Sequence, residues 1–127
     1  MDTCALVLVG VRGVTPFQAR LTFAIARHAV VDLAQSFHLN PRAHDDRRLD
    51  PERLRQLRAW LAHSNVEVAE GPEADAKLAQ LRAMYEPYVQ ALSELLVSPL
   101  PGWLPPDRLR FNWETTAWAK TVSDEAH

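Results

Sequence analysis

Three polar residues at helical spacing could do chemistry together. Arg27, His28 and Asp32 lie close in the sequence, and the four-residue spacing of His28 and Asp32 places both on one helix face, where they can form a hydrogen bond. A carboxylate that orients an imidazole is half of a general-base device. No nucleophile or ligand can be placed beside them from the sequence. A polar cluster inside a helical bundle is therefore the simpler interpretation of the trio, and catalysis is the alternative.

The other candidate ligands and nucleophiles form no recognisable motif. The five histidines include no HExxH pair and no two at a four-residue spacing. His44, with Asp45 and Asp46, could hold a metal loosely, but zinc needs three or four converging ligands. Cys4 lies in an apolar run, where burial makes a thiol inert. The chain also contains no P-loop, GxGxxG, GxSxG or CxxC motif. We expect no metal and no cofactor.

Basic and aromatic clusters point to surfaces and packing. Five arginines between residues 47 and 58 alternate with acidic residues, which predicts a solvated helix face with local ion pairs and leaves membrane-surface binding as a minor alternative. Aromatic residues dominate interface hot spots. Because they follow or continue the proline-rich segment "SPLPGWLPP", the tryptophans are expected either to dock the tail or to form a subunit interface: Trp103, Trp113 and Trp118.

Composition limits the class of protein. A chain of 127 residues suits one domain. With 14 basic and 16 acidic residues the net charge is -2, which argues against nucleic acid as the main partner. The single cysteine cannot form an internal disulfide, and a cytosolic, reducing location fits. The apolar run at 4–11 is too short to span a bilayer, and Asp2 does not suit a signal peptide.

The first half of the chain predicts two helices. Residues 2–12 are compatible with a helix or a strand, and we favour a helix ending near Gly10 or Gly13. A second helix should run from Pro16 to about Leu39, with Thr15 as its N-cap in a capping box. Apolar residues almost encircle it, so it is predicted to be the central, buried helix: Leu21, Phe23, Ile25, Ala26, Val30, Val31, Leu33, Ala34 and Phe37.

The second half predicts two further helices. Asp50 should cap a helix that starts at Pro51 and fades at 63–65, and a short extended piece follows at 66–69. The inner stripe of that helix is Leu54, Leu57, Trp60 and Leu61. The last helix opens near residue 72 and should bend at Pro87, on its solvent side. Its inward stripe is Leu78, Leu81, Tyr85, Tyr88, Leu92 and Leu95.

Together these elements predict one all-α domain over residues 1–127. It is a small helical bundle around a central buried helix. An extended Pro/Trp-rich tail, residues 99–127, should pack on the bundle, because its prolines favour a polyproline-like strap.

Four stretches, taken in order, resemble a known family. They are "DTCALVLVGV" (2–11), "ARLTFAIARHAVVDLAQ" (19–35), "LRAMYEPYVQALSELL" (81–96) and "NWETTAW" (112–118). They resemble the end of the cytosolic region of bacterial potassium-channel-like proteins with two transmembrane helices. In that family, the first stretch finishes a helix that begins further upstream. The filter loop that a potassium pore needs is missing here, so no filter residue carries over to this sequence.

The resemblance implies a non-enzymatic, cytosolic assembly or regulatory domain associated with an ion-channel-like membrane protein. Its partner would be a second copy of the chain or a membrane-channel subunit, with no nucleic acid and no membrane-spanning segment in this chain. Two alternatives stay open: a small hydrolase or transferase using His28 and Asp32, and a plain oligomeric scaffold.

Overall fold

The computed structural model describes residues 1–43 and 46–104, and over these residues the chain is all-α, as predicted. The described residues contain five α-helices, one short 3₁₀ turn and no strand longer than a single bridge. The elements are α1 (Asp2–Gly10), α2 (Phe17–Ser36), η1 (Asp46–Arg48), α3 (Pro51–His63), α4 (Pro72–Ala83) and α5 (Glu86–Leu96).

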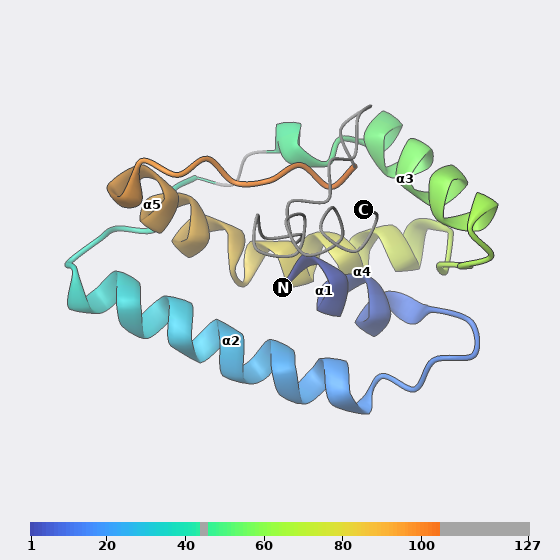
Figure 1. Ribbon diagram of the computed structural model, residues 1–127, viewed down its shortest axis with the longest axis horizontal. Coiled ribbons are helices and arrows are strands. Elements are labelled where there is room, and N and C mark those ends of the chain that lie inside the picture. The colour runs from blue at the N-terminus through green and yellow to red at the C-terminus, as the bar shows by residue number, and fades with distance from the viewer. Residues whose placement is uncertain (44–45, 105–127) are drawn as a thin grey trace, which may run out of the picture.

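The helices form an open bundle with α1 near its middle (Figure 1). α1 packs against α2 on one side and against α4 on the other, and α5 packs against α2 beyond the end of α1. Residues 97–104 return as an extended strap along the edge of the molecule opposite α2. The buried core cluster lies between these elements, and Val89 of α5 and Trp103 of the strap pack against it. Its buried residues are Ala5, Phe23, Leu49, Leu57, Leu78 and Tyr85.

Residues 2–10 are a helix, which settles the choice between helix and strand. Gly10 ends α1 with a φ of 138°, a conformation that side-chain-bearing residues rarely adopt. The next residue, Val11, forms an isolated antiparallel bridge with Val68. The amide of Ala69 also donates to the Gly10 carbonyl at 2.8 Å. The extended piece expected at 66–69 is therefore present, and it ties the end of α1 to the segment before α4.

The prediction that residues 16–39 form a central, encircled helix is wrong in its burial, although the helix itself is present. In α2 only Phe23 and Ala34 are buried. Ile25 is 71% exposed and Phe17 65%. The reason is that α1 and α5 cover one side of α2, and no other described helix packs on it. A helix that is apolar on nearly every side is expected to be enclosed by other elements. α1 fits this expectation better than α2, because α1 lies between α2 and α4.

One of the two predicted helix caps is observed. The carboxylate of Asp50 accepts a hydrogen bond from the Arg53 amide at 2.8 Å, which caps α3 as expected. Thr15 does not cap α2: the N-cap is Pro16, with no side-chain hydrogen bond. The helix starts one residue later than the pattern suggested, so the Thr15 hydroxyl is out of register with the first free amides.

Pro87 marks a break rather than a bend. The expected single helix is divided into α4 and α5, and Pro87 lies in the first turn of α5, half-buried. The amides of Met84 and Tyr85 bond to carbonyls three residues earlier, which tightens the end of α4. In the predicted stripes, Leu57, Leu78 and Tyr85 are buried as expected, whereas Trp60 and Leu95 are exposed.

Candidate functional site

The most buried polar residues form an ionic cluster at the junction of α4 and α5. Arg82 and Glu86 are four residues apart and only 5% exposed, with the Arg82 Nε 3.0 Å from the Glu86 Oε1. Arg48, from η1, donates to Glu86 at 2.7 Å and to Asp2 of α1 at 2.7 Å. Two guanidinium groups thus face two carboxylates, and this pairing offsets the cost of burying the charges.

Tyr85 and Trp103 close the ionic cluster. The Tyr85 hydroxyl donates to Asp2 at 2.5 Å, and burial, reinforced by that carboxylate, holds the pKa of the phenol far above its ordinary value of 10.0. The Trp103 ring lies 5.8 Å from the guanidinium carbon of Arg48 and 5.9 Å from that of Arg82. Arg48 also donates to the Pro101 carbonyl at 3.0 Å. The cluster therefore fastens the strap to the bundle.

This cluster has the geometry of a structural site. Its carboxylates accept hydrogen bonds from arginines and from the phenol, so neither is left as a free base, and a phenol with a raised pKa stays protonated at neutral pH. Sequence reasoning missed it entirely, although the i,i+4 spacing of Arg82 and Glu86 is a signal that could have found one of its pairs. Trp103 contacts this cluster in its own chain, and its proposed interface role stays a prediction.

The trio Arg27, His28 and Asp32 is not a buried polar cluster. His28 and Asp32 are exposed on α2, and among the described residues neither side chain has a hydrogen-bond or ion-pair partner. Arg27 is half-buried and donates its Nε to the Met84 carbonyl at 3.1 Å. That carbonyl becomes available because α4 ends there. Arg27 thus latches α2 to the α4–α5 junction, and the catalytic use of His28 with Asp32 stays a hypothesis without a supporting contact.

Other candidate sites lie partly outside the described residues. His44, Asp45, Trp113 and Trp118 fall outside them, and no group of three potential metal ligands occurs within residues 1–43 and 46–104. Cys4 is a half-buried free thiol. The basic cluster of residues 47–58 forms ion pairs: Arg53 with Asp50, Arg55 with Glu52, Arg58 with Asp75, and Arg48 with Asp2 and Glu86.

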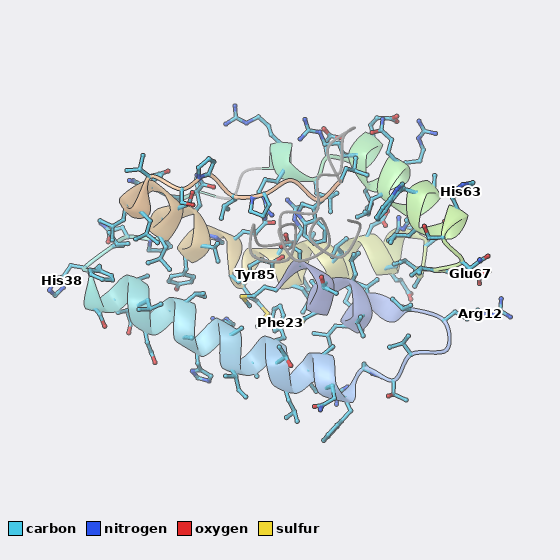
Figure 2. All side chains as sticks on the ribbon, viewed as in Figure 1. Arg12, Phe23, His38, His63, Glu67 and Tyr85 are labelled. Atoms are coloured by element: carbon cyan, nitrogen blue, oxygen red, sulfur yellow. The ribbon has the colours of Figure 1, made fainter. Side chains whose placement is uncertain are left out.

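A row of exposed apolar side chains follows α2, and α2 lies along the edge of the bundle (Figure 1). Apolar residues recur there every fourth position, and the five large ones are 46% to 71% exposed. We call this surface the assembly face, and its residues are Phe17, Leu21, Ile25, Ala29, Leu33 and Phe37. On the side of α2 opposite Ile25, Phe23 points inwards and packs edge-to-face on Tyr85, with 5.8 Å between the two ring centroids (Figure 2).

Two hollows flank α4. A groove of about 640 Å³ separates it from α3, and two of the charged residues that line it, Arg58 and Asp75, form an ion pair with each other. A second hollow of about 440 Å³ lies between α1, α2 and α4. We call it the basic cleft, because its charged lining residues are all basic: Arg20, Arg27, His28 and Lys77. Its apolar lining includes Leu8, Phe23, Ala24, Leu81 and Met84.

None of the helices in the described part of the chain is both long enough and apolar enough to cross a membrane. In comparisons with known proteins, no family model, no curated protein and no solved structure matches this chain.

Proposed function

We propose that this chain is a non-enzymatic assembly module, which pairs with a second copy of itself through the assembly face of α2. The observation that carries this proposal is the exposure of Phe17, Leu21, Ile25, Leu33 and Phe37 along one helix. Isolated exposed apolar residues are normal in proteins, but a continuous row is typical of an interaction surface. In the ionic cluster, in contrast, both carboxylates are already paired with groups of the same chain.

The spacing of the assembly face favours a second copy as its occupant. Its residues recur at every fourth position, and such a row turns by about 40° around the helix at each step. The centre of the face is therefore Leu21, Ile25, Ala29 and Leu33, and a two-fold axis between Ile25 and Ala29 relates these four in pairs. Under an antiparallel arrangement, Leu21 of one copy faces Leu33 of the other, and the large Ile25 faces the small Ala29. An interface of this kind is self-complementary, as a two-fold dimer requires. Rows at four-residue spacing also pack on one another, at crossing angles near −50°.

Pairing through one helix should be weak. A helix of 20 residues is about 30 Å long and about 10 Å wide, and one face of it is smaller than the roughly 800 Å² that each partner contributes to a standard interface. We therefore expect a monomer–dimer equilibrium that depends on concentration. Contacts from residues outside the described ranges would strengthen it.

Sedimentation over a concentration series tests the assembly. The wild-type chain should become dimeric as its concentration rises, and Ile25→Glu should keep it monomeric because a carboxylate would be buried at the centre of the interface. Trp60→Glu is the matched control, since Trp60 is also an exposed apolar residue, at 44%, but lies on α3. A wild-type chain that stays monomeric, or an Ile25→Glu variant that still pairs, would contradict the proposal.

A charge-pair rescue tests the antiparallel register. Leu21→Glu and Leu33→Lys should each weaken pairing when made alone. The double variant Leu21→Glu/Leu33→Lys should recover part of it, because the two-fold axis places the new carboxylate opposite the new ammonium group of the other copy. A parallel arrangement would instead place like charges together, and the double variant would then pair less well than either single variant.

We further propose, from the four resembling stretches, that the module serves an ion-channel-like membrane protein. The exposed assembly face supports this proposal only in general terms, since channel subunits must be brought together and α2 offers a surface for that. The test is genomic: an upstream reading frame that encodes pore helices and a filter loop would support it. An unrelated upstream frame would leave the plain oligomeric scaffold as the better proposal.

A further inference from the structure

Most of the arginine side chains of the described residues have an ionic partner. Seven arginines form ion pairs with carboxylates, and Arg47 has a partner as well. Within residues 1–43 and 46–104, three cationic side chains have no carboxylate within ion-pair distance: Arg20, Arg27 and Lys77. All three line the basic cleft.

The basic cleft combines this unpaired positive charge with an apolar interior. Phe23 is buried, and Leu8 and Leu81 are half-buried, so they form its floor. Arg20 and Lys77 are exposed at the rim, on α2 and α4, and His28 lies beside them. No Asp or Glu appears among the residues that line it. The positive charge is local, because the whole chain carries a formal net charge of -2.

This arrangement selects the class of ligand. An apolar floor gains free energy by covering an aliphatic group, and guanidinium and ammonium groups bind carboxylates through charge-assisted hydrogen bonds. A volume of about 440 Å³ is within the size range of small-molecule sites. The one carbocyclic ring in the lining, Phe23, is 5% exposed, so it contributes apolar floor rather than an open stacking platform.

We propose that the basic cleft binds a single-chain carboxylate amphiphile, a fatty-acid anion. The apolar chain would lie on Leu8, Phe23 and Leu81, and the carboxylate would be held by Arg20, Lys77 and the Nη groups of Arg27. The Nε of Arg27 is already used by the Met84 carbonyl, which fixes the position of the guanidinium at the side of the cleft. None of the residues that line this site belongs to the assembly face, so the two proposals are tested by different variants and either can fail without the other.

Titration of the ¹⁵N-labelled chain with dodecanoate, below its micelle concentration, tests the inference. We expect saturable shifts at the amides of residues that line the cleft, and a matching calorimetric isotherm. Dodecyl maltoside supplies the same chain with a neutral head, and acetate supplies the head without the chain. Both should bind at least tenfold more weakly than dodecanoate. Equal binding of either control, or shifts spread over the whole surface, would overturn the proposal.

Two cleft variants test the binding of the carboxylate head and of the hydrocarbon chain separately. Arg20→Gln/Lys77→Gln should weaken dodecanoate binding about tenfold, whereas the matched control Arg12→Gln/Arg55→Gln, which removes two exposed arginines elsewhere, should leave it unchanged. Ala24→Trp should block the cleft without removing a buried side chain, since Ala24 is exposed. Unchanged affinity in both cleft variants would overturn the site. A competing acidic peptide that binds more tightly than dodecanoate would replace the fatty-acid anion with a protein partner and also overturn it.

Discussion

The ionic cluster and α2 differ in what their side chains contact. In the cluster, the carboxylates of Asp2 and Glu86 accept hydrogen bonds from Arg48, Arg82 and Tyr85. Among the described residues, only the Arg48 Nε and the Trp103 Nε1 there are buried without a hydrogen-bond partner. On α2, large apolar side chains face outwards and meet no other described helix. The first region therefore pairs its carboxylates within the fold, whereas the second keeps large apolar side chains exposed. The difference separates a part that maintains the fold from a part that is available for binding.

The largest effect should come from breaking the cluster. Glu86→Gln keeps the side-chain volume but leaves Arg82 and Arg48 without their shared carboxylate in a buried site. We expect a loss of about 3–5 kcal/mol of unfolding free energy in urea titrations. Glu94→Gln is the control, because Glu94 pairs with Arg42 at the surface, and it should cost at most about 1 kcal/mol. Similar losses in both variants would show that the cluster is no more than a set of surface pairs.

A smaller loss should follow from removing the buried anchor of α2. Phe23→Ala deletes the ring that meets Tyr85 and should cost about 3 kcal/mol. Hydrogen exchange should accelerate in α2 more than in α4, because Phe23 and Ala34 are the only buried residues of α2. Ile25→Ala, measured at low protein concentration, should change stability by no more than about 0.5 kcal/mol. If Ile25→Ala costs as much as Phe23→Ala, the comparison between inner and outer faces is wrong.

The phenol of Tyr85 should give the cluster a pH dependence. The pKa of Tyr85 is raised in the folded chain, so its contribution is complete below the unfolded value near 10.0 and is lost as the pH rises above it. Tyr85→Phe should cost about 1–2 kcal/mol at pH 7, from the lost bond to Asp2. The same variant should also lose less unfolding free energy than the wild-type chain as the pH rises above 10. Unfolding monitored by circular dichroism at a series of pH values measures this. Tyr88→Phe is the control at pH 7 and should cost less than Tyr85→Phe, because no hydrogen bond of the Tyr88 hydroxyl is found among the described residues.

The smallest effects on stability should come from the residues that precede α2 and α3, and they should differ between the two helices. Asp50→Ala removes an observed cap from α3 and should cost about 1 kcal/mol. Thr15→Ala should change the unfolding free energy by less than about 0.5 kcal/mol, because Thr15 makes no capping bond to α2. Thermal unfolding of the two variants side by side provides the measurement. A costly Thr15→Ala would mean that the capping box forms in solution after all.

Local signals in the sequence predicted the helices, and long-range contacts decided what the sequence could not predict. The cap at Asp50 and the end of α1 near Gly10 depend on neighbours a few residues away, so their patterns were readable. The burial of α2 depends on how much of it α1 and α5 can cover. The ionic cluster joins Arg48 to residues 46 positions earlier and 38 positions later. Nothing in local spacing brings Asp2 and Glu86 to the same arginine.

The break between α4 and α5 has a geometric consequence for the size of the molecule. At 1.5 Å per residue, a helix of nine residues is about 13 Å long and one of eleven is about 16 Å long. Placed end to end, α1 and α5 together match the roughly 30 Å of α2. An uninterrupted rod from residue 72 to residue 96 would have stayed in the layer behind α1. Because the helix breaks at Met84 and Tyr85, α5 can instead pack against the half of α2 that α1 is too short to reach.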